Sequence, residues 1–468
     1  MGQRGADPGD PTDRAPSAAM PLPPIDDTIA AIATAPGTGA IGVVRVSGPE
    51  ALPIAAALFR PVGNEDVTSL SAGRFVVGRV VDDDEFLDQG VLLVFRAPAS
   101  ATGQDVVELQ VHGGPALLSA VLSACLRRGA RAAGPGEFTL RGFLAGKLDL
   151  AQAESVQALV SARSEAARRH AGIGLAGGLS RRIDALQQQL TTVYAAVLAM
   201  LDYPEEGVPD AAVSSPLEAA LAELDALLAT ARAGRAARLG ATMALVGRPN
   251  AGKSSLLNAL LGYERALVSD VPGTTRDYLE VPLELGRASV TAIDTAGLRA
   301  TNDAIEGAGV ALARNLAASA DVVVAVIDGS VALIDDDRAL VDELGGARTL
   351  WVAAKADAGR AWDADDLGVE RIHRVSTIDR RGLADLRAAL EAAVVGDAAA
   401  SEAWLLGERH EAVVREARDA VQRARTAPDD LRGLDLETAL RALAQVTGRG
   451  DVAEQTLSEV FARFCVGK

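Results

Sequence analysis

The sequence has few cysteines, no long apolar run and no excess of positive charge. Its 468 residues include only Cys125 and Cys465, too few for a disulfide framework, so a reducing, cytoplasmic environment is expected. Without a run of about eighteen or more apolar residues, no membrane-spanning helix is expected. The formal net charge of −17 argues against broad, non-specific binding of nucleic acid. A local basic groove or a basic partner stays compatible with that charge.

The length and composition are those of a multidomain globular protein. A chain of 468 residues is too long for one core, and its 49% hydrophobic and 23% charged residues are ordinary for folded domains. Residues 1–22 are rich in Gly, Pro, Asp and Arg without an apolar period, which predicts a disordered tail and lacks the apolar core of a signal peptide. Translation from Met20 is an alternative, because patterned sequence begins directly after it.

Four regions follow the tail. Residues 23–147 alternate short β-branched runs with Gly-rich turns and one apolar helix, which predicts a small α+β domain. Residues 148–237 and 398–468 have helical period. Between them, residues 238–397 alternate strands and helices, as in a doubly wound parallel sheet. The simplest arrangement is an all-α helical domain into which an α/β domain is inserted.

The strongest motif is TMALVGRPNAGKSS, Thr242–Ser255, where a strand runs into a phosphate loop and then into a helix. Gly247 and Gly252 permit the tight turn whose amides wrap phosphates, and the helix adds its positive N-terminus. Lys253 can reach the outer phosphates, and the Ser254 hydroxyl can ligate Mg²⁺. The motif predicts a P-loop nucleotide site.

Three later segments complete a GTPase pattern. Asp294–Gly297 closes the strand VTAID, near the metal and the terminal phosphate. In Gly273–Asp277, Thr275 offers a second Mg²⁺ hydroxyl. Asp357 of Lys355-Ala-Asp357 can accept both the N1 and N2 protons of guanine, so GTP is the expected nucleotide.

The pattern departs from other GTPases in three places. Ala354 stands where Asn is usual before the lysine, which removes an amide that braces the base loop, and Ser376-Thr377 is a loose match to the usual Ser-Ala. Leu298 follows Asp-Thr-Ala-Gly where Ras-like enzymes have the glutamine that orients water. Another residue must position that water, or hydrolysis is negligible.

Together these motifs resemble the MnmE (TrmE) family, one of the GTPase groups related to Era and EngA. The resemblance covers nearly the whole chain. It rests on Asp26–Gly48, Thr102–Gly114, Pro135–Ser155, Gly247–Leu260 and the ending Phe464–Lys468, which reads FCVGK.

The resemblance implies an enzyme of tRNA wobble-uridine modification. Members of this family act with an FAD-containing partner, MnmG, to place a carboxymethylaminomethyl or aminomethyl group on carbon 5 of the uridine. Their N-terminal domain binds a formyl-tetrahydrofolate (5-formyl-tetrahydrofolate or a related folate) and forms the homodimer. Their G domains pair across the potassium-bound nucleotide during hydrolysis.

The resemblance also assigns residues. Folate contacts fall on Arg45, Glu108, Lys147 and Lys468. The K⁺ ligands fall on Asn250, Ser269, Val271 and Thr274, and the Mg²⁺ ligands on Ser254 and Thr275. The predicted GTP-binding set comprises Asn250, Ala251, Gly252, Lys253, Ser254, Ser255, Ser269, Asp270, Val271, Pro272, Gly273, Thr274, Thr275, Asp294, Thr295, Ala296, Gly297, Ala354, Lys355, Ala356, Asp357, Ser376, Thr377 and Ile378.

Three residues are predicted to be catalytic: Lys253, Glu306 and Cys465. Glu306 matches the family's catalytic glutamate and can orient water in place of a glutamine, although it can equally be a solvated helix charge. Cys465 either does chemistry or only lines a pocket. Phe461 and Phe464 are expected to pin this tail to the helical domain.

Two residues outside the predicted sites are given structural roles. Cys125 is expected in the core and His112 in a turn or packing role.

The competing function is a non-catalytic guanine-nucleotide switch or a ribosome-assembly GTPase of the Era-like class, which would need neither the folate-domain motifs nor the cysteine tail.

Overall fold

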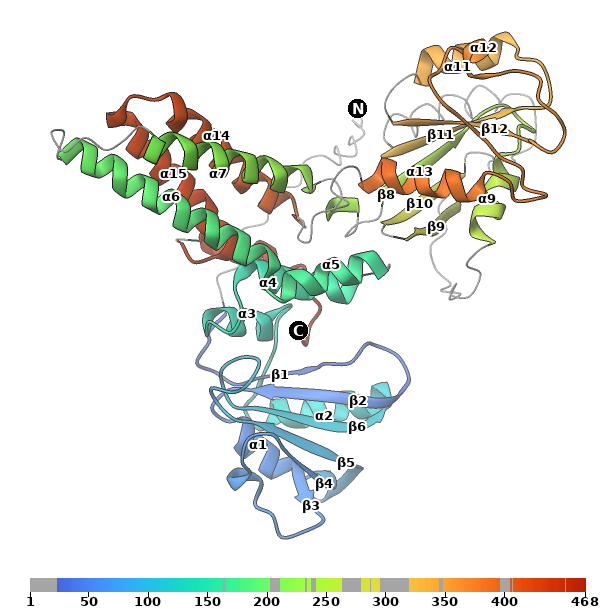
Figure 1. Cartoon of the computed structure of the whole chain (residues 1–468). Coiled ribbons are helices and arrows are strands. Elements are labelled where there is room, and N and C mark those ends of the chain that lie inside the picture. The colour runs from blue at the N-terminus through green and yellow to red at the C-terminus, as the bar shows by residue number, and fades with distance from the viewer. Residues whose placement is uncertain are drawn as a thin grey trace, which may run out of the picture. The chain divides into compact units, whose positions relative to one another are not determined.

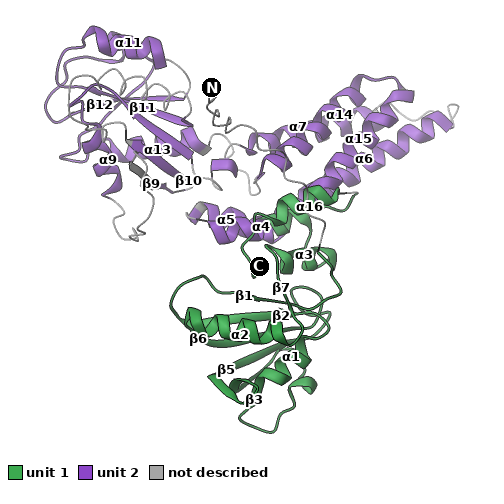
Figure 2. Ribbon diagram, turned by 180° about the vertical axis from the view of Figure 1, so that it is seen from behind, with its two compact units in different colours: residues 1–154, 448–468 green, residues 155–447 purple. Residues whose placement is uncertain are grey.

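The structure is a computed structural model. It describes residues 23–162, 165–202, 211–231, 234–236, 241–262, 279–286, 288–294, 320–344, 348–395, 405, 407–450 and 452–468. The chain divides into two compact units, coloured in Figure 2. One contains the residues up to Glu154 together with Gly448–Lys468, and the other runs from Ser155 to Thr447. The predicted tail, residues 1–22, lies outside the described residues.

The first unit is built on a seven-stranded sheet with the order β3-β4-β5-β6-β2-β1-β7. The strands are β1 (Ile29–Ile32), β2 (Gly39–Ser47), β3 (Phe59–Pro61), β4 (Arg74–Asp82), β5 (Glu85–Phe95), β6 (Val106–Gly113) and β7 (Arg131–Ala132). Pairing is antiparallel except between β1 and β7. Alternation of apolar and polar residues along β4 and β6 buries one face, as period-2 patterning dictates.

Two helices cover the buried face of this sheet, α1 (Ala51–Leu58) and α2 (Pro115–Arg127), as Figure 1 shows. Their apolar side chains form one core with the inward residues of the strands. Cys125 on α2 is fully buried, as predicted, and burial raises the pKa of its thiol to about 12. A short 3₁₀ helix, η1 (Val67–Ser69), and α3 (Glu137–Leu144) complete this part of the unit.

The C-terminal tail packs within the first unit. Helix α16 (Glu454–Phe461) contacts α3, and the ring of Phe461 lies 6.4 Å from that of Phe143 and 5.3 Å from that of Phe464. The two phenylalanines therefore pin the tail as expected, but within the unit of the α+β domain. Residues 448–468, expected in the second part of the helical domain, group with that unit instead.

The second unit contains a helical bundle formed from segments on both sides of an insertion. Helices α6 (Gly178–Asp202) and α7 (Ala211–Ala229) pack against α14 (Glu408–Thr426) and α15 (Asp429–Thr447) (Figure 1). An Arg418–Asp225 ion pair of 3.0 Å links α14 to α7. The prediction of a split helical domain is confirmed. Helices α4 (Leu150–Ser161) and α5 (Glu165–Leu175) precede the bundle in sequence.

The insertion is an α/β domain with the strand order β13-β12-β11-β8-β10-β9. Its elements are β8 (Ala241–Val246), α9 (Lys253–Leu261), β9 (Leu279–Leu285), β10 (Ala288–Asp294), β11 (Val322–Asp328), α11 (Asp335–Leu344), β12 (Thr349–Ala354), α12 (Ala364–Leu367), β13 (Ile372–Arg374) and α13 (Leu383–Val395). All pairings are parallel except β9 with β10. The parallel sheet was predicted, whereas its antiparallel edge strand β9 was not.

Among the helices that the structure describes, none is long and apolar enough to cross a membrane.

Candidate functional sites

The carboxyl edge of the α/β sheet gathers the predicted nucleotide motifs. The phosphate loop follows β8, the base loop 354–357 follows β12, and Ser376 follows β13. Strand β8 lies between β10 and β11, so the chain changes direction along the sheet at this strand. Ligands bind at such switch points in open α/β sheets.

The phosphate loop needs glycine at its first position. Gly247 has φ +143°, and a Cβ there would lie 2.1 Å from the carbonyl oxygen of Val326. Gly252 is also left-handed, at φ +106°, and caps the start of α9. Between them Asn250 adopts φ +62°, a conformation that Asn tolerates better than most residues. The sequence therefore folds into the tight loop that the motif predicts.

Lys253 directs its charge into this loop. Its side chain is buried, and Nζ donates to the carbonyl oxygens of Gly247 and Arg248 at 2.7 and 2.8 Å. A buried ammonium needs such partners. The loop thus holds a positive charge where a P-loop binds phosphates, while Ser254 and Ser255, in the first turn of α9, are exposed.

Arg248, to which sequence reasoning gave no role, ties the loop to a neighbouring helix. Its Nε donates to Oδ1 of Asp337 at 2.7 Å, and Asp337 is 1% exposed. The other oxygen of Asp337 accepts from the Ile334 amide at the start of α11. An arginine inside the motif was visible in the sequence, but nothing there indicated its partner 89 residues away.

The base loop has an ion pair beside it. Lys355 has φ +58°, and its Nζ donates to Oδ2 of Asp328 at 2.6 Å. Burial alone would raise the pKa of Asp328, but hydrogen bonds from Lys355 and Ser330 hold that pKa below its usual value. Asp328 is therefore ionised at neutral pH. Ala354 is buried, and the Ala356 amide donates to the carbonyl of Val375.

The second base-loop segment is ordered by Ser376. This residue is fully buried, and its hydroxyl accepts from the amides of Ile378 and Asp379, both at 3.3 Å. Ile378 itself is 80% exposed. The predicted segments 354–357 and 376–378 thus lie at the ends of adjacent, paired strands.

Several predicted residues lie outside the described part of the chain. They are Ser269, Asp270, Val271, Pro272, Gly273, Thr274, Thr275, Thr295, Ala296, Gly297 and Glu306, and of Asp294 only the backbone is described. Of the predicted K⁺ ligands the structure therefore describes only Asn250, and of the predicted Mg²⁺ ligands only Ser254.

In the first unit, two of the predicted folate contacts form an ion pair. Arg45 on β2 and Glu108 on β6 are register partners, and their side chains meet at 2.8 Å. They lie on the sheet face opposite α1 and α2, since their neighbours Val44, Val46 and Val107 are buried in the core. Both side chains keep partial exposure, 25% and 15%, so a ligand can reach them.

The C-terminal tail closes one side of this pair. An Nη of Arg45 lies 3.4 Å from the carbonyl oxygen of Gly467, and the guanidinium lies 5.6 Å from the ring centre of Phe138. Gly467 has φ +94°, and a Cβ there would be 2.3 Å from the Ile32 carbonyl oxygen. Only glycine fits this approach, which explains the Gly before the final lysine.

The tail is also bonded along its backbone to the start of α3. The Gly136 amide donates to the Cys465 carbonyl at 3.3 Å, and the Phe138 amide donates to Lys468 O at 3.2 Å. Cys465 is exposed and forms no disulfide. Lys147 is exposed beyond the end of α3, near Gly103. The structure thus brings Arg45, Glu108 and the tail backbone together.

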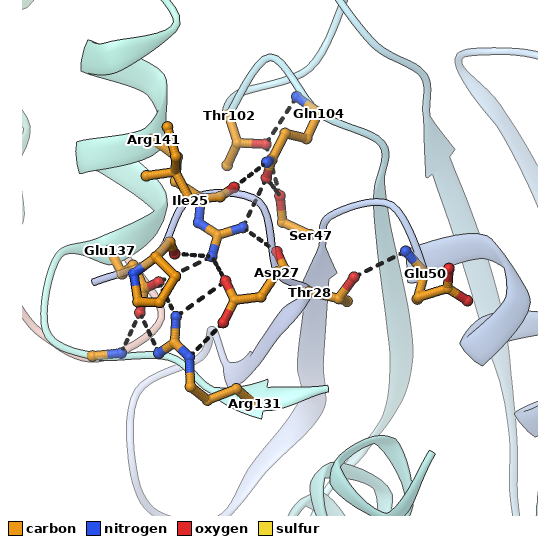
Figure 3. Close-up of polar contacts among 12 residues, drawn as sticks. Ile25, Asp27, Thr28, Ser47, Glu50, Thr102, Gln104, Arg131, Glu137 and Arg141 are labelled. Carbon is orange, nitrogen blue, oxygen red and sulfur yellow. Dashed lines mark hydrogen bonds and ion pairs between the residues drawn. The ribbon is translucent and has the colours of Figure 1, made fainter. Parts of the chain in front are cut away.

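A network of charges holds α3 itself (Figure 3). Glu137 is 2% exposed and accepts from Arg131, Arg141 and the Gly134 amide. Asp27 accepts from the same two guanidinium groups. Burial alone would raise the pKa of Glu137, but the hydrogen bond from Arg131, with the Gly134 amide and the charges of both arginines, holds it below its usual value.

His112 does not have the expected turn or packing role, because it lies in strand β6 with an exposed side chain. Its side chain is 78% exposed, and Nδ1 lies 2.9 Å from both oxygens of Asp88 on the neighbouring strand. The His112 amide also donates to Asp88. The prediction was wrong because the partner, Asp88, is 24 residues away in the sequence, and nothing near His112 indicates this pairing.

The N-terminal domain and the helical domain both match known protein families. A family model described as "GTP-binding protein TrmE N-terminus" matches residues 28–147, and one described as "MnmE helical domain" matches residues 150–465. The chain belongs to the MnmE family. The family predicted from the motifs is thereby confirmed.

Curated members of the family align along their full length. A "tRNA modification GTPase MnmE" of Thermus thermophilus is 50% identical over 446 residues, 95% of this chain and 100% of that protein. The proteins of the same name from a Synechococcus species and from Moorella thermoacetica are 42% and 40% identical. They align over 96% and 95% of this chain and 100% of their own length.

Proposed function

We propose that this chain is a cytoplasmic GTPase of tRNA modification that couples a potassium-stimulated nucleotide cycle to one-carbon transfer onto carbon 5 of the wobble uridine. The main support for this proposal is the following observation. A phosphate loop and a base loop share one sheet edge, in a chain that aligns with proteins named tRNA modification GTPase over 95% of its length.

GTP hydrolysis is assigned to the α/β domain. The Lys253 ammonium and the loop amides stabilise charge that develops on the phosphates during transfer. Asn250 and Ser254, on either side of the segment 251–253, fit as oxygen donors for K⁺ and Mg²⁺, and these ions would supply further positive charge. Glu306 is proposed to orient the attacking water, and Asp357 to select guanine.

Folate binding is assigned to the open sheet face of the first unit. An arginine and a glutamate that are ion-paired yet partly exposed fit a ligand that carries both hydrogen-bond donors and acceptors. Bound folate would supply the one-carbon unit. Lys147 and Lys468 are proposed to contribute charge, and Cys465 a thiol, beside that face.

The partners are proposed to be a second copy of the chain, an MnmG-type FAD protein and tRNA. The row of register partners Phe75, Leu93, Glu108 and Arg45 crosses the open sheet face, and Phe75 is 69% exposed. An exposed aromatic side chain on this face favours an interface with another protein. We propose that a second copy of the chain binds there. The net charge of −17 favours tRNA delivery by the partner complex over direct capture.

Turnover in potassium and sodium tests the catalytic part. GTP hydrolysis is measured at equal ionic strength in KCl and in NaCl, for the wild type and for Asn250→Ala. The proposal expects roughly tenfold or greater stimulation by K⁺ in the wild type and its loss in the variant. Equal, slow turnover in both salts would instead favour the non-catalytic switch.

A further inference from the structure

The base loop lacks the amide that usually braces it. Ala354 stands at that position, is 3% exposed, and faces the phosphate loop, because a Cβ placed on Gly252 would lie 3.4 Å from the Ala354 Cβ. A methyl group makes van der Waals contact there but offers no hydrogen bond. Another group has to fix the loop if it is to hold Asp357 against guanine.

Asp328 is placed to do this. It ends β11, directly beside β12, and is the register partner of Ala354. Its Oδ2 accepts from Lys355 Nζ at 2.6 Å, while Oδ1 accepts from both the amide and the hydroxyl of Ser330. The carboxylate thereby fastens the one loop residue, Lys355, whose backbone is left-handed.

The turn after Asp328 is bonded to the base loop as well. The Gly329 amide donates to the Ala354 carbonyl at 2.9 Å, and the Gly329 carbonyl accepts from the Ala361 amide at 3.0 Å. The Trp362 indole, 4% exposed, donates Nε1–H to the Asp328 carbonyl at 3.0 Å. Asp328 is therefore held on its backbone and on both carboxylate oxygens, so it is a rigid anchor.

We propose that Asp328 is a positioning residue for guanine specificity, which takes the bracing role of the missing asparagine by holding Lys355 and, through it, Asp357. The inference rests on the proposed GTP binding. It separates two tasks within the site: the phosphate loop binds any nucleoside diphosphate, whereas the Asp328-fixed loop distinguishes the base.

Binding of GDP and inosine diphosphate tests the inference, because inosine lacks the exocyclic N2 amine that Asp357 would read. Dissociation constants are measured by calorimetry for the wild type, Asp328→Asn and Asp328→Ala. The expected result is about tenfold weaker GDP binding with a smaller loss for inosine diphosphate, which keeps only the N1 proton of the two that Asp357 accepts from guanine, so that the preference for GDP falls.

The controls distinguish positioning from general damage. Asp336→Asn, at an exposed carboxylate of α11, should leave both constants unchanged. Adding Ala354→Asn to Asp328→Asn should restore most of the GDP preference. If the wild type binds GDP and the Asp328 variants keep its preference within twofold, the inference is overturned. A wild type that fails to bind GDP would overturn the proposed function instead.

Discussion

Replacing Glu137 by glutamine removes one of two carboxylates that hold two arginines at the start of α3. Glu137 and Arg141 are each 2% exposed, and loss of one partner from a buried ion pair typically costs about 3–5 kcal/mol. We expect the lower end, about 3 kcal/mol, because Asp27 still pairs with both arginines. A free energy of that size makes local opening about a hundredfold more frequent.

Hydrogen exchange measured by mass spectrometry reads this opening directly. Peptides covering Glu137–Leu144 should exchange about a hundredfold faster in Glu137→Gln than in the wild type. The matched control is Glu165→Gln, which removes an ion pair with Arg168 where both side chains are about 60% exposed, and should leave exchange unchanged. Acceleration of less than threefold in Glu137→Gln would refute the assignment of α3 stability to this network.

The same network predicts a pH dependence. The folded pKa of Glu137 lies below the ordinary value of 4.5, so its ionisation stabilises the fold fully above that value. The contribution is lost as the pH falls through the lower, folded pKa. The stability difference between the wild type and Glu137→Gln should therefore shrink below about pH 4. A difference that persists at about pH 2 would contradict this reasoning.

Three further substitutions test the two sites. Gly247→Ala should abolish nucleotide binding, because its Cβ would collide with the Val326 carbonyl at 2.1 Å; loss of fluorescent-GDP binding in a protein that melts normally is the expected result. Gly467→Ala should displace the tail from the Ile32 carbonyl and raise exchange in peptides covering residues 461–468, whereas unchanged exchange would argue against the close approach. Arg45→Met should weaken calorimetric binding of 5-formyl-tetrahydrofolate by roughly tenfold or more, since it removes a charged hydrogen-bond donor, and unaltered affinity would move the folate site elsewhere.

Local patterns predicted the fold well where each element is self-contained. The strand, loop and helix around Gly247–Ser254 have their own hydrophobic period and glycines, so the local sequence is sufficient to predict all three. The edge strand β9 was missed because Pro282 breaks the run of strand-forming residues in its sequence, LEVPLEL. Proline is tolerated there only because β9 lies at the sheet edge and pairs on one side with β10.

The features that could not be predicted from the sequence are contacts between residues far apart in the chain. The spacing of Phe461 and Phe464 predicted an apolar anchor, but nothing local says that its partner is Phe143, more than three hundred residues earlier. The Asp328–Lys355 pair and the Asp88–His112 pair are likewise formed by strands that the sheet brings together. Register, rather than composition, decides such pairs.

The proposed role in tRNA modification is tested by mass spectrometry of tRNA nucleosides from a bacterial strain that lacks its own MnmE-family protein but retains MnmG. The strain is complemented with this protein or with Lys253→Ala, at matched expression. The wild type is expected to restore the carbon-5 modification of the wobble uridine, and Lys253→Ala is expected not to. Unmodified wobble uridine in the strain that expresses the wild type would contradict it.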